Sequence, residues 1–289
     1  MGFRLKYSWL LTLFLLVTVG ISAQTAELVS ENRVEAPAAV ETAKKRDIVL
    51  PFAAGEVLTY EAKYNRILRG IPAADLTLKV ANASSDGDVL ITADARSKGT
   101  LLKMVRFSFL QQYESIIATD IFRALKTTKL DVQKERVRNS EAVFNYDEDR
   151  VTWVETDPKE PMRPPRKIAS SIEDQTHDII SGIYALRILP LAVGKTFNLT
   201  VSDSGLVYHV PVRVTAREQQ KTELGKLWCF RVEPEVFGTG RMIEREGSMV
   251  IWITDDQRRL PVRSQINSPI GRIEVKIKAI EQEKPAKQS

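Results

Sequence analysis

Residues that could perform metal or nucleophilic chemistry are scarce in this 289-residue chain. It has two histidines, His177 and His209, and a single cysteine, Cys229. No Cys/His spacing suits zinc, and there is no His-Glu-x-x-His motif, no Gly-x-Ser-x-Gly elbow and no phosphate-binding glycine loop. The sequence therefore predicts no catalytic residue, no metal site and no cofactor, and hence a protein that is not an enzyme.

Two pairs of adjacent residues, His177–Asp178 and Asp255–Asp256, each allow more than one interpretation. His177 beside Asp178 could form an acid–base pair, but the first turn of a helix capped by an acid explains it better. Asp255 and Asp256 precede a Leu-Pro-Val segment, which favours a polar hairpin turn over a cation site. A hydrolase acting on envelope glycans would need two or more of these four residues to converge in one cleft. It is the least favoured interpretation.

The first 23 residues predict a secretory signal peptide. Arg4 and Lys6 form a basic start, Trp9 to Val19 carry no charge, and Ala23 is a small residue at a plausible cleavage site. The apolar stretch of 11 residues is short of the roughly 20 that a spanning helix needs, so an uncleaved anchor is the weaker alternative. We therefore expect a periplasmic or extracellular protein, with no stable transmembrane segment after cleavage.

Composition narrows the partners. The leader holds two basic residues and no acid, so its removal lowers the net charge from +5 to +3. Basic and acidic residues are interspersed rather than clustered, which excludes a nucleic-acid partner. Cys229 lies in the apolar run Leu227–Phe230 and cannot form an intrachain disulfide, so we expect a buried, unreactive thiol.

Alternating polar and apolar residues dominate the chain and predict antiparallel strands with one buried face. The apolar rows are Leu76/Leu78/Val80, Leu206/Tyr208/Val210/Val212/Val214, Trp228/Phe230/Val232 and Ile273/Val275/Ile277. Met249 to Ile253 is apolar on both faces, which predicts a strand covered on both sides. An apolar stripe from Ile179 to Leu189, ended by Pro190, predicts the principal helix, and Thr100 to Val105 could form a second, short one.

These patterns predict a mainly β fold, a long curved antiparallel sheet that forms an open or half-barrel around one principal helix. We expect a flexible tether over residues 24–47, a single β-rich domain over 48–280 and a disordered tail over 281–289. An apolar cluster near the middle of the chain is either ordinary core or the wall of a ligand cavity. The candidate ligand-binding wall consists of Leu102, Val105, Phe107, Phe109 and Tyr113.

Several segments together resemble an uncharacterised bacterial envelope family, domain of unknown function 3108. They are residues 50–60 with 70–74, residues 178–187 with 191–194, residues 225–234 and residues 252–262. The resemblance implies an envelope protein, and it brings no activity and no catalytic residues. The segment 252–262 is also similar to the closing strands of lipoprotein-carrier half-barrels, which implies an open barrel with an apolar hollow.

The leading hypothesis is a non-enzymatic envelope protein that binds a lipid-like apolar ligand or a protein partner in the hollow of the sheet. The first alternative is a structural or assembly protein that uses exposed strand edges. The second is the glycan hydrolase considered above. The oligomeric state is not predictable from the sequence.

Overall fold

The computed structural model describes residues 49–65, 70–85, 87–99 and 108–282. The leader, the tether, Thr100 to Val105 and the last seven residues lie outside this part of the chain. The described residues form one 15-stranded sheet and the helix α2, Ile179–Ile188. The strands are β1 Glu56–Asn65, β2 Ile71–Asn82, β3 Asp88–Ser97, β4 Phe109–Ala118, β5 Arg123–Gln133, β6 Arg136–Asn145, β7 Arg150–Thr156, β8 Arg166–Ser171, β9 Thr176–His177, β10 Thr196–Asp203, β11 Leu206–Thr222, β12 Gly225–Pro234, β13 Ser248–Thr254, β14 Pro261–Ser268 and β15 Gly271–Gln282.

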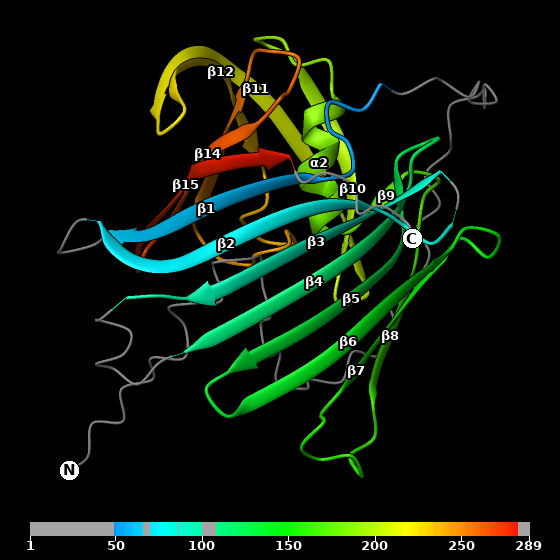
Figure 1. The fold of residues 1–289 in the computed structure, drawn as a ribbon. Coiled ribbons are helices and arrows are strands. Elements are labelled where there is room, and N and C mark those ends of the chain that lie inside the picture. The colour runs from blue at the N-terminus through cyan, green and yellow to red at the C-terminus, as the bar shows by residue number, and fades with distance from the viewer. Residues whose placement is uncertain (1–48, 66–69, 86, 100–107, 283–289) are drawn as a thin grey trace, which may run out of the picture.

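Two antiparallel meanders make up the sheet. Strands β1 to β8 run as one meander and β10 to β15 as another, and the pairing of β1 with β15 joins them into one surface (Figure 1). Among the named strands of the described residues, β9 alone pairs in parallel, with β10. The β1–β15 junction brings the start and the end of the domain side by side, with Leu58 opposite Ile280.

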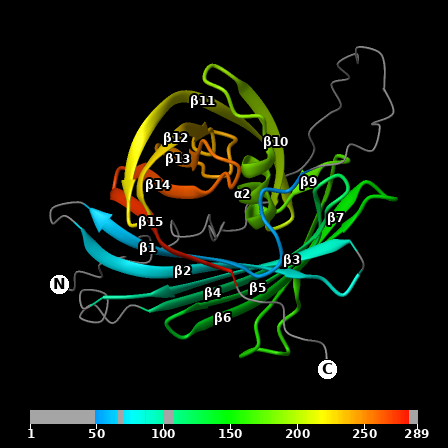
Figure 2. The same ribbon diagram turned by 45° about the horizontal axis from the view of Figure 1, so that its top comes forward.

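The sheet curves around α2, as the sequence predicts. Figure 2 shows β10 to β15 curling over the helix while β1 to β7 form a broader layer beneath it. The helix contacts β3, β4, β9 and β10. It begins at Asp178 because the Asp178 side chain and the Ser181 backbone form a capping box, and it ends before Pro190.

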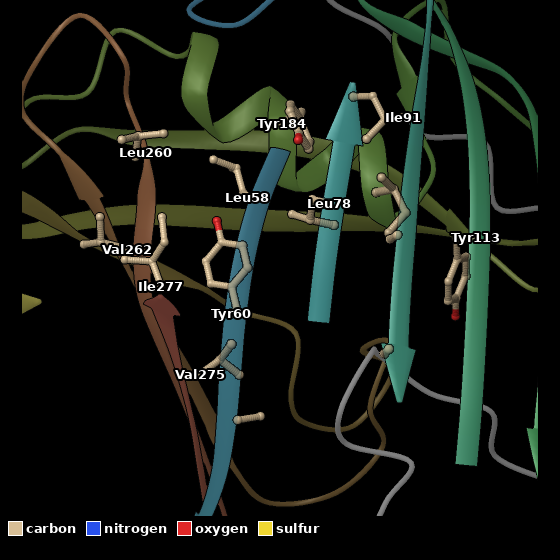
Figure 3. Packing of buried hydrophobic residues seen from close by; sticks show 14 of the residues in the cluster. Leu58, Tyr60, Leu78, Ile91, Tyr113, Tyr184, Leu260, Val262, Val275 and Ile277 are labelled. Atoms are coloured by element: carbon tan, nitrogen blue, oxygen red, sulfur yellow. The ribbon is translucent and has the colours of Figure 1, made fainter. Parts of the chain in front are cut away.

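The core confirms the predicted strand faces. Leu58, Leu78 and Ile91 from β1 to β3 pack in one cluster with Tyr184 of α2, as Figure 3 shows. The strand Ser248–Thr254 is buried on both faces: Val250 and Trp252 belong to this cluster, whereas Ile251 and Ile253 belong to a second cluster inside the β10–β13 curl. The strand with two apolar faces is therefore the one that the curled sheet covers on both sides.

Two members of the predicted apolar rows are exposed instead. Trp228 is 47 % exposed and Leu206 is 38 % exposed, although most later residues of the two rows are buried, namely Val210, Val212, Val214, Phe230 and Val232. Each of the two exposed residues is the first of its row. The Arg217 guanidinium covers Trp228 at 4.5 Å from the ring centroid, which offsets part of the exposure.

Strands β8 and β9 form the two ends of the sheet, and each end approaches the opposite half of the sheet. In the described residues, no ladder of backbone hydrogen bonds joins an end to that half. Gly205, in the turn between β10 and β11, packs against Trp153 and Ile168, and its carbonyl accepts a hydrogen bond of 2.7 Å from Ser170 Oγ. We call this contact the seam. The outer edge of β8 carries exposed Arg166 and Lys167 rather than apolar residues, a pattern that discourages strand addition.

A buried ion pair fixes the C-terminal end of α2. The Arg187 side chain is fully buried and makes two hydrogen bonds to the Glu56 carboxylate, of 2.6 and 2.9 Å. It also donates to the carbonyls of Pro51 and Arg258. One guanidinium thus ties together the start of the domain, the helix and the β13–β14 turn.

Candidate functional site

The carboxylate of Asp178 is fully occupied at the N-terminus of α2. Oδ1 accepts hydrogen bonds from the Ser181 backbone at 2.7 Å and from the Ser181 hydroxyl at 3.0 Å. Oδ2 accepts from the hydroxyls of Ser115 on β4 and Thr127 on β5. This side chain starts the helix and fastens it to the sheet, so the capping interpretation is confirmed.

His177 shows no arrangement suited to acid–base catalysis. Its side chain is buried, and the ring lies 6.0 Å from the Phe122 ring. Burial lowers the pKa of His177 to about 4, so the imidazole is neutral at ordinary pH. Its Nδ1 makes no hydrogen bond, to Asp178 or to any other described residue. His209, in contrast, is exposed.

Asp255 and Asp256 form the predicted turn between β13 and β14. Asp255 pairs with Arg217 at 2.6 Å, and Asp256 accepts from the Thr254 hydroxyl at 2.7 Å. Burial would raise the pKa of Asp256, but hydrogen bonds from Thr254 and Arg258 outweigh it and lower the pKa. This turn lies at the C-terminal end of α2, where Arg187 contacts Arg258, so roughly 15 Å of helix separates it from Asp178. The cleft required by the hydrolase hypothesis is not formed.

A small recess lies beside the N-terminus of α2. It is enclosed by β4 to β7 on one side and by the end of β10 with the following turn on the other. Its apolar walls are Ala142, Phe144, Trp153 and Ile179. Tyr113, Thr127, Lys129, Ser140, Ser202 and Asp203 supply the polar groups. Aromatic walls with a few converging polar groups are typical of small-molecule sites.

The polar groups of the recess are only partly satisfied. The Lys129 ammonium lies 4.8 Å from the centroid of the Tyr113 ring, and no described carboxylate lies within ion-pair distance of it. The Tyr113 hydroxyl is buried and makes no hydrogen bond of normal geometry. Burial raises the pKa of Asp203 to about 6, against the opposing influence of Lys129 and of hydrogen bonds from Ser204. The recess therefore brings together the Lys129 ammonium, the Tyr113 hydroxyl and the Asp203 carboxyl, whose pKa is raised.

The recess is small. Its cavity volume is about 30 Å³, which holds about two water molecules. Elsewhere in the described hollow, Ile180, Tyr184 and Ala185 of α2 pack directly against the sheet. A complete acyl chain has no room in this recess as the structure stands.

The candidate ligand-binding wall is divided by the structure. Leu102, Val105 and Phe107 lie outside the described residues. Phe109 is buried in the main core, and Tyr113 lines the recess. Lys129, Asp203 and Trp153 were not among the candidates, because the sequence gives no sign that they meet. Alternation places Lys129 and Thr127 on one face of β5, but only the pairing of Lys129 with Tyr113 shows that this face is the inner one.

Metal binding and membrane spanning have simple structural tests. Among the described residues, no group of three or more His, Cys, Asp or Glu side chains could hold a metal ion. The same part of the chain has no helix long and apolar enough to cross a membrane. Cys229 is buried, so that part of the expectation is confirmed, and burial raises the pKa of its thiol to about 12, which disfavours the reactive thiolate.

Comparisons with known proteins identify a family and two solved structures that the chain resembles. A family model described as "Protein of unknown function (DUF3108)" matches residues 59–278. No curated protein matches the chain. The beta-barrel-like protein of domain of unknown function DUF1849 from Brucella abortus matches with a TM-score of 0.50 and 8% identity, covering 78% of this chain and 96% of that one. A protein with a YmcC-like fold from Bacteroides fragilis has a TM-score of 0.32 and 10% identity, covering 80% of this chain and 98% of that one.

Proposed function

We propose, from the premise that this chain belongs to the DUF3108 family of proteins of unknown function, that it is an exported, non-enzymatic binding protein of the cell envelope. The predicted signal peptide supports export. The occupied carboxylate of Asp178, the neutral buried His177 and the separate Asp255–Asp256 turn argue against a catalytic role for these residues. Binding, rather than covalent chemistry, is the function that these residues support best.

The ligand that we propose is a lipid-like amphiphile whose polar headgroup enters the recess. The observation that carries this proposal is the buried Tyr113 hydroxyl, which makes no hydrogen bond of normal geometry to a described residue and lies beside the Lys129 ammonium, which has no described carboxylate within ion-pair distance. A buried hydroxyl without a partner costs about 1–3 kcal/mol, so an acceptor group on a ligand would relieve this cost. Trp153 and Phe144 would contact the adjoining apolar part.

Size determines how such a ligand would enter. A cavity of about 30 Å³ admits at most a small group, so the rest of the molecule would remain outside or the recess would open. The seam is the part of the wall suited to opening. One side-chain hydrogen bond and the packing of Gly205 hold it, whereas backbone ladders hold neighbouring strands elsewhere. A protein partner remains the alternative occupant.

Native mass spectrometry of the protein purified from the envelope of its own cells tests the proposal. We expect an added mass of lipid size that is lost in Lys129→Met and reduced in Tyr113→Phe. The matched control is Lys126→Met, on the same strand but on the outer face, where Lys126 pairs with Glu141. This control should retain the added mass.

A second measurement separates a ligand contact from a structural role. If Tyr113 only supports the fold, Tyr113→Phe should leave ligand retention unchanged. If its hydroxyl binds the ligand, the variant should be at least as stable as the wild type without ligand, because it removes an unpaired buried group, but should retain less ligand. Absence of any bound small molecule from envelope-purified protein, or equal retention in all three variants, contradicts the proposal.

A further inference from the structure

A second and larger cavity lies on the opposite face of the sheet from α2. Its volume is about 240 Å³. Glu61 and Lys63 of β1, with Glu274, Lys276 and Lys278 of β15, form one wall, and these residues alternate with core residues such as Ala62 and Val275. We call this cavity the outer groove, and it lies on a different surface from the recess at α2.

The tip of the β11–β12 hairpin forms the other wall. Lys221, Thr222 and Glu223 of this tip line the groove, and the Lys278 Nζ pairs with the Glu223 Oε1 at 3.1 Å across it. This contact joins two walls that are far apart in the sequence. The groove therefore depends on the tertiary structure.

Lysines outnumber the acidic groups that line the groove. Four lysines face three glutamates, and two of these glutamates also bind a cation outside the lining. Glu61 is shared between Lys63 at 3.0 Å and Lys98 at 3.5 Å. Glu274 is shared between Lys276 at 3.3 Å and Arg263 at 2.5 Å.

Lys221 is the clearest surplus charge. It is exposed, and it has no carboxylate within ion-pair distance among the described residues. The pairs of Lys63, Lys276 and Lys278 are partly exposed and are therefore weak, so these ammonium groups can turn toward a bound anion at little cost. Up to four ammonium groups can thus face one ligand.

From this arrangement we propose that the outer groove binds a phosphate monoester carried on a sugar-sized group. A phosphate monoester presents several strong acceptor oxygens at nearly two negative charges, which suits several lysine donors around one point. The volume exceeds what a bare phosphate fills and leaves room for the attached group. The phosphate could belong to a soluble phosphorylated metabolite or to a lipid headgroup.

Two probes test the site and distinguish its sources. Calorimetric titration of the full chain with glucose 1-phosphate measures the soluble form, with glucose as the neutral control. Co-sedimentation with phosphatidylcholine vesicles, with and without phosphatidic acid, measures the lipid form. We expect at least one probe to bind and the affinity to fall as salt rises, because the contacts are charged and accessible to solvent.

A pair of matched variants decides the outcome. Lys221→Gln should weaken binding about tenfold, since it removes the one unpaired ammonium of the groove without disturbing an ion pair. Lys195→Gln, an exposed lysine outside the groove, should bind like the wild type. Binding of only one probe supports the site and identifies its source. Binding of neither probe, or equal affinities for the wild type and Lys221→Gln, overturns the proposal.

Discussion

Removing the charge of Glu56 should severely destabilise the fold, because Arg187 would then be a buried cation without a counterion. The Arg187 side chain is 0% exposed and that of Glu56 is 9% exposed, and two hydrogen bonds of 2.6 and 2.9 Å join them. Arg187 also donates to the carbonyls of Pro51 and Arg258. Glu56→Gln keeps the shape of the side chain, but it removes the charge and replaces one of the two acceptor oxygens with an amide NH2 that cannot accept from Arg187.

Breaking a buried pair from one side costs about 3–5 kcal/mol, mainly through the uncompensated charge that remains. We expect a loss in this range for Glu56→Gln and for Arg187→Met. The double variant leaves no buried charge, so its loss should be smaller than the sum of the two single losses by at least about 2 kcal/mol. This non-additivity measures the pair itself, apart from the packing of either side chain.

Urea denaturation followed by circular dichroism gives the free energy of unfolding for all four proteins. The control is Glu160→Gln, which breaks the exposed Arg163–Glu160 pair and should cost less than about 0.5 kcal/mol. The reasoning would be refuted if the single losses added to the double loss within about 0.5 kcal/mol. A Glu56→Gln variant as stable as the control would refute it equally.

Three further changes test other parts of the structure. Because the pKa of Asp203 is raised from 3.8 to about 6 on folding, the folded state binds this proton more tightly, so the free energy of unfolding should fall as pH rises between about 4 and 6; Asp203→Asn should remove this part of the pH dependence. Asp178→Ala should cost about 2 kcal/mol or more, because it removes the helix cap and the acceptor of the buried Ser115 hydroxyl. Gly205→Ala should destabilise the protein more than Gly225→Ala. Both glycines have positive φ, but only at Gly205 would the new Cβ lie 2.9 Å from neighbouring side chains.

Each of these expectations has a contrary result. Equal pH dependence of stability in the wild type and Asp203→Asn would show that Asp203 is not perturbed. A loss below about 0.5 kcal/mol for Asp178→Ala would mean that water replaces the cap. Equal losses of stability for the two glycine variants, measured by thermal unfolding, would show that the seam accommodates the new Cβ of Gly205→Ala without strain.

Much of the fold was predictable because its signals are local. The alternation at Ile273, Val275 and Ile277 identifies the buried face of β15 without knowledge of its neighbours. The doubly apolar Met249 to Ile253 indicated a strand covered on both sides, and two separate clusters cover it. Asp178 and Pro190 set the bounds of α2 through rules that act within a few residues.

The same local signals failed where burial depends on how far the core extends. Trp228 belongs to the same alternating row as Phe230 and Val232, yet it lies half exposed under Arg217, because the cluster that buries Phe230 and Val232 does not extend to it. The recess was likewise hidden from the sequence. Lys129, Asp203 and Trp153 come from β5, β10 and β7, and no spacing rule connects them.

The sequence by itself determined the elements of this protein: the strand faces, the capped helix, the polar turns and the inert cysteine, since each depends on interactions between residues close in the chain. Only the tertiary structure decided which faces meet. The pairing of β1 with β15, the burial of Arg187 against Glu56 and the placement of Lys129 and Asp203 in one recess all depend on strand order and register. Contacts between distant segments arise from the summed packing of the whole sheet, which no short stretch of sequence encodes.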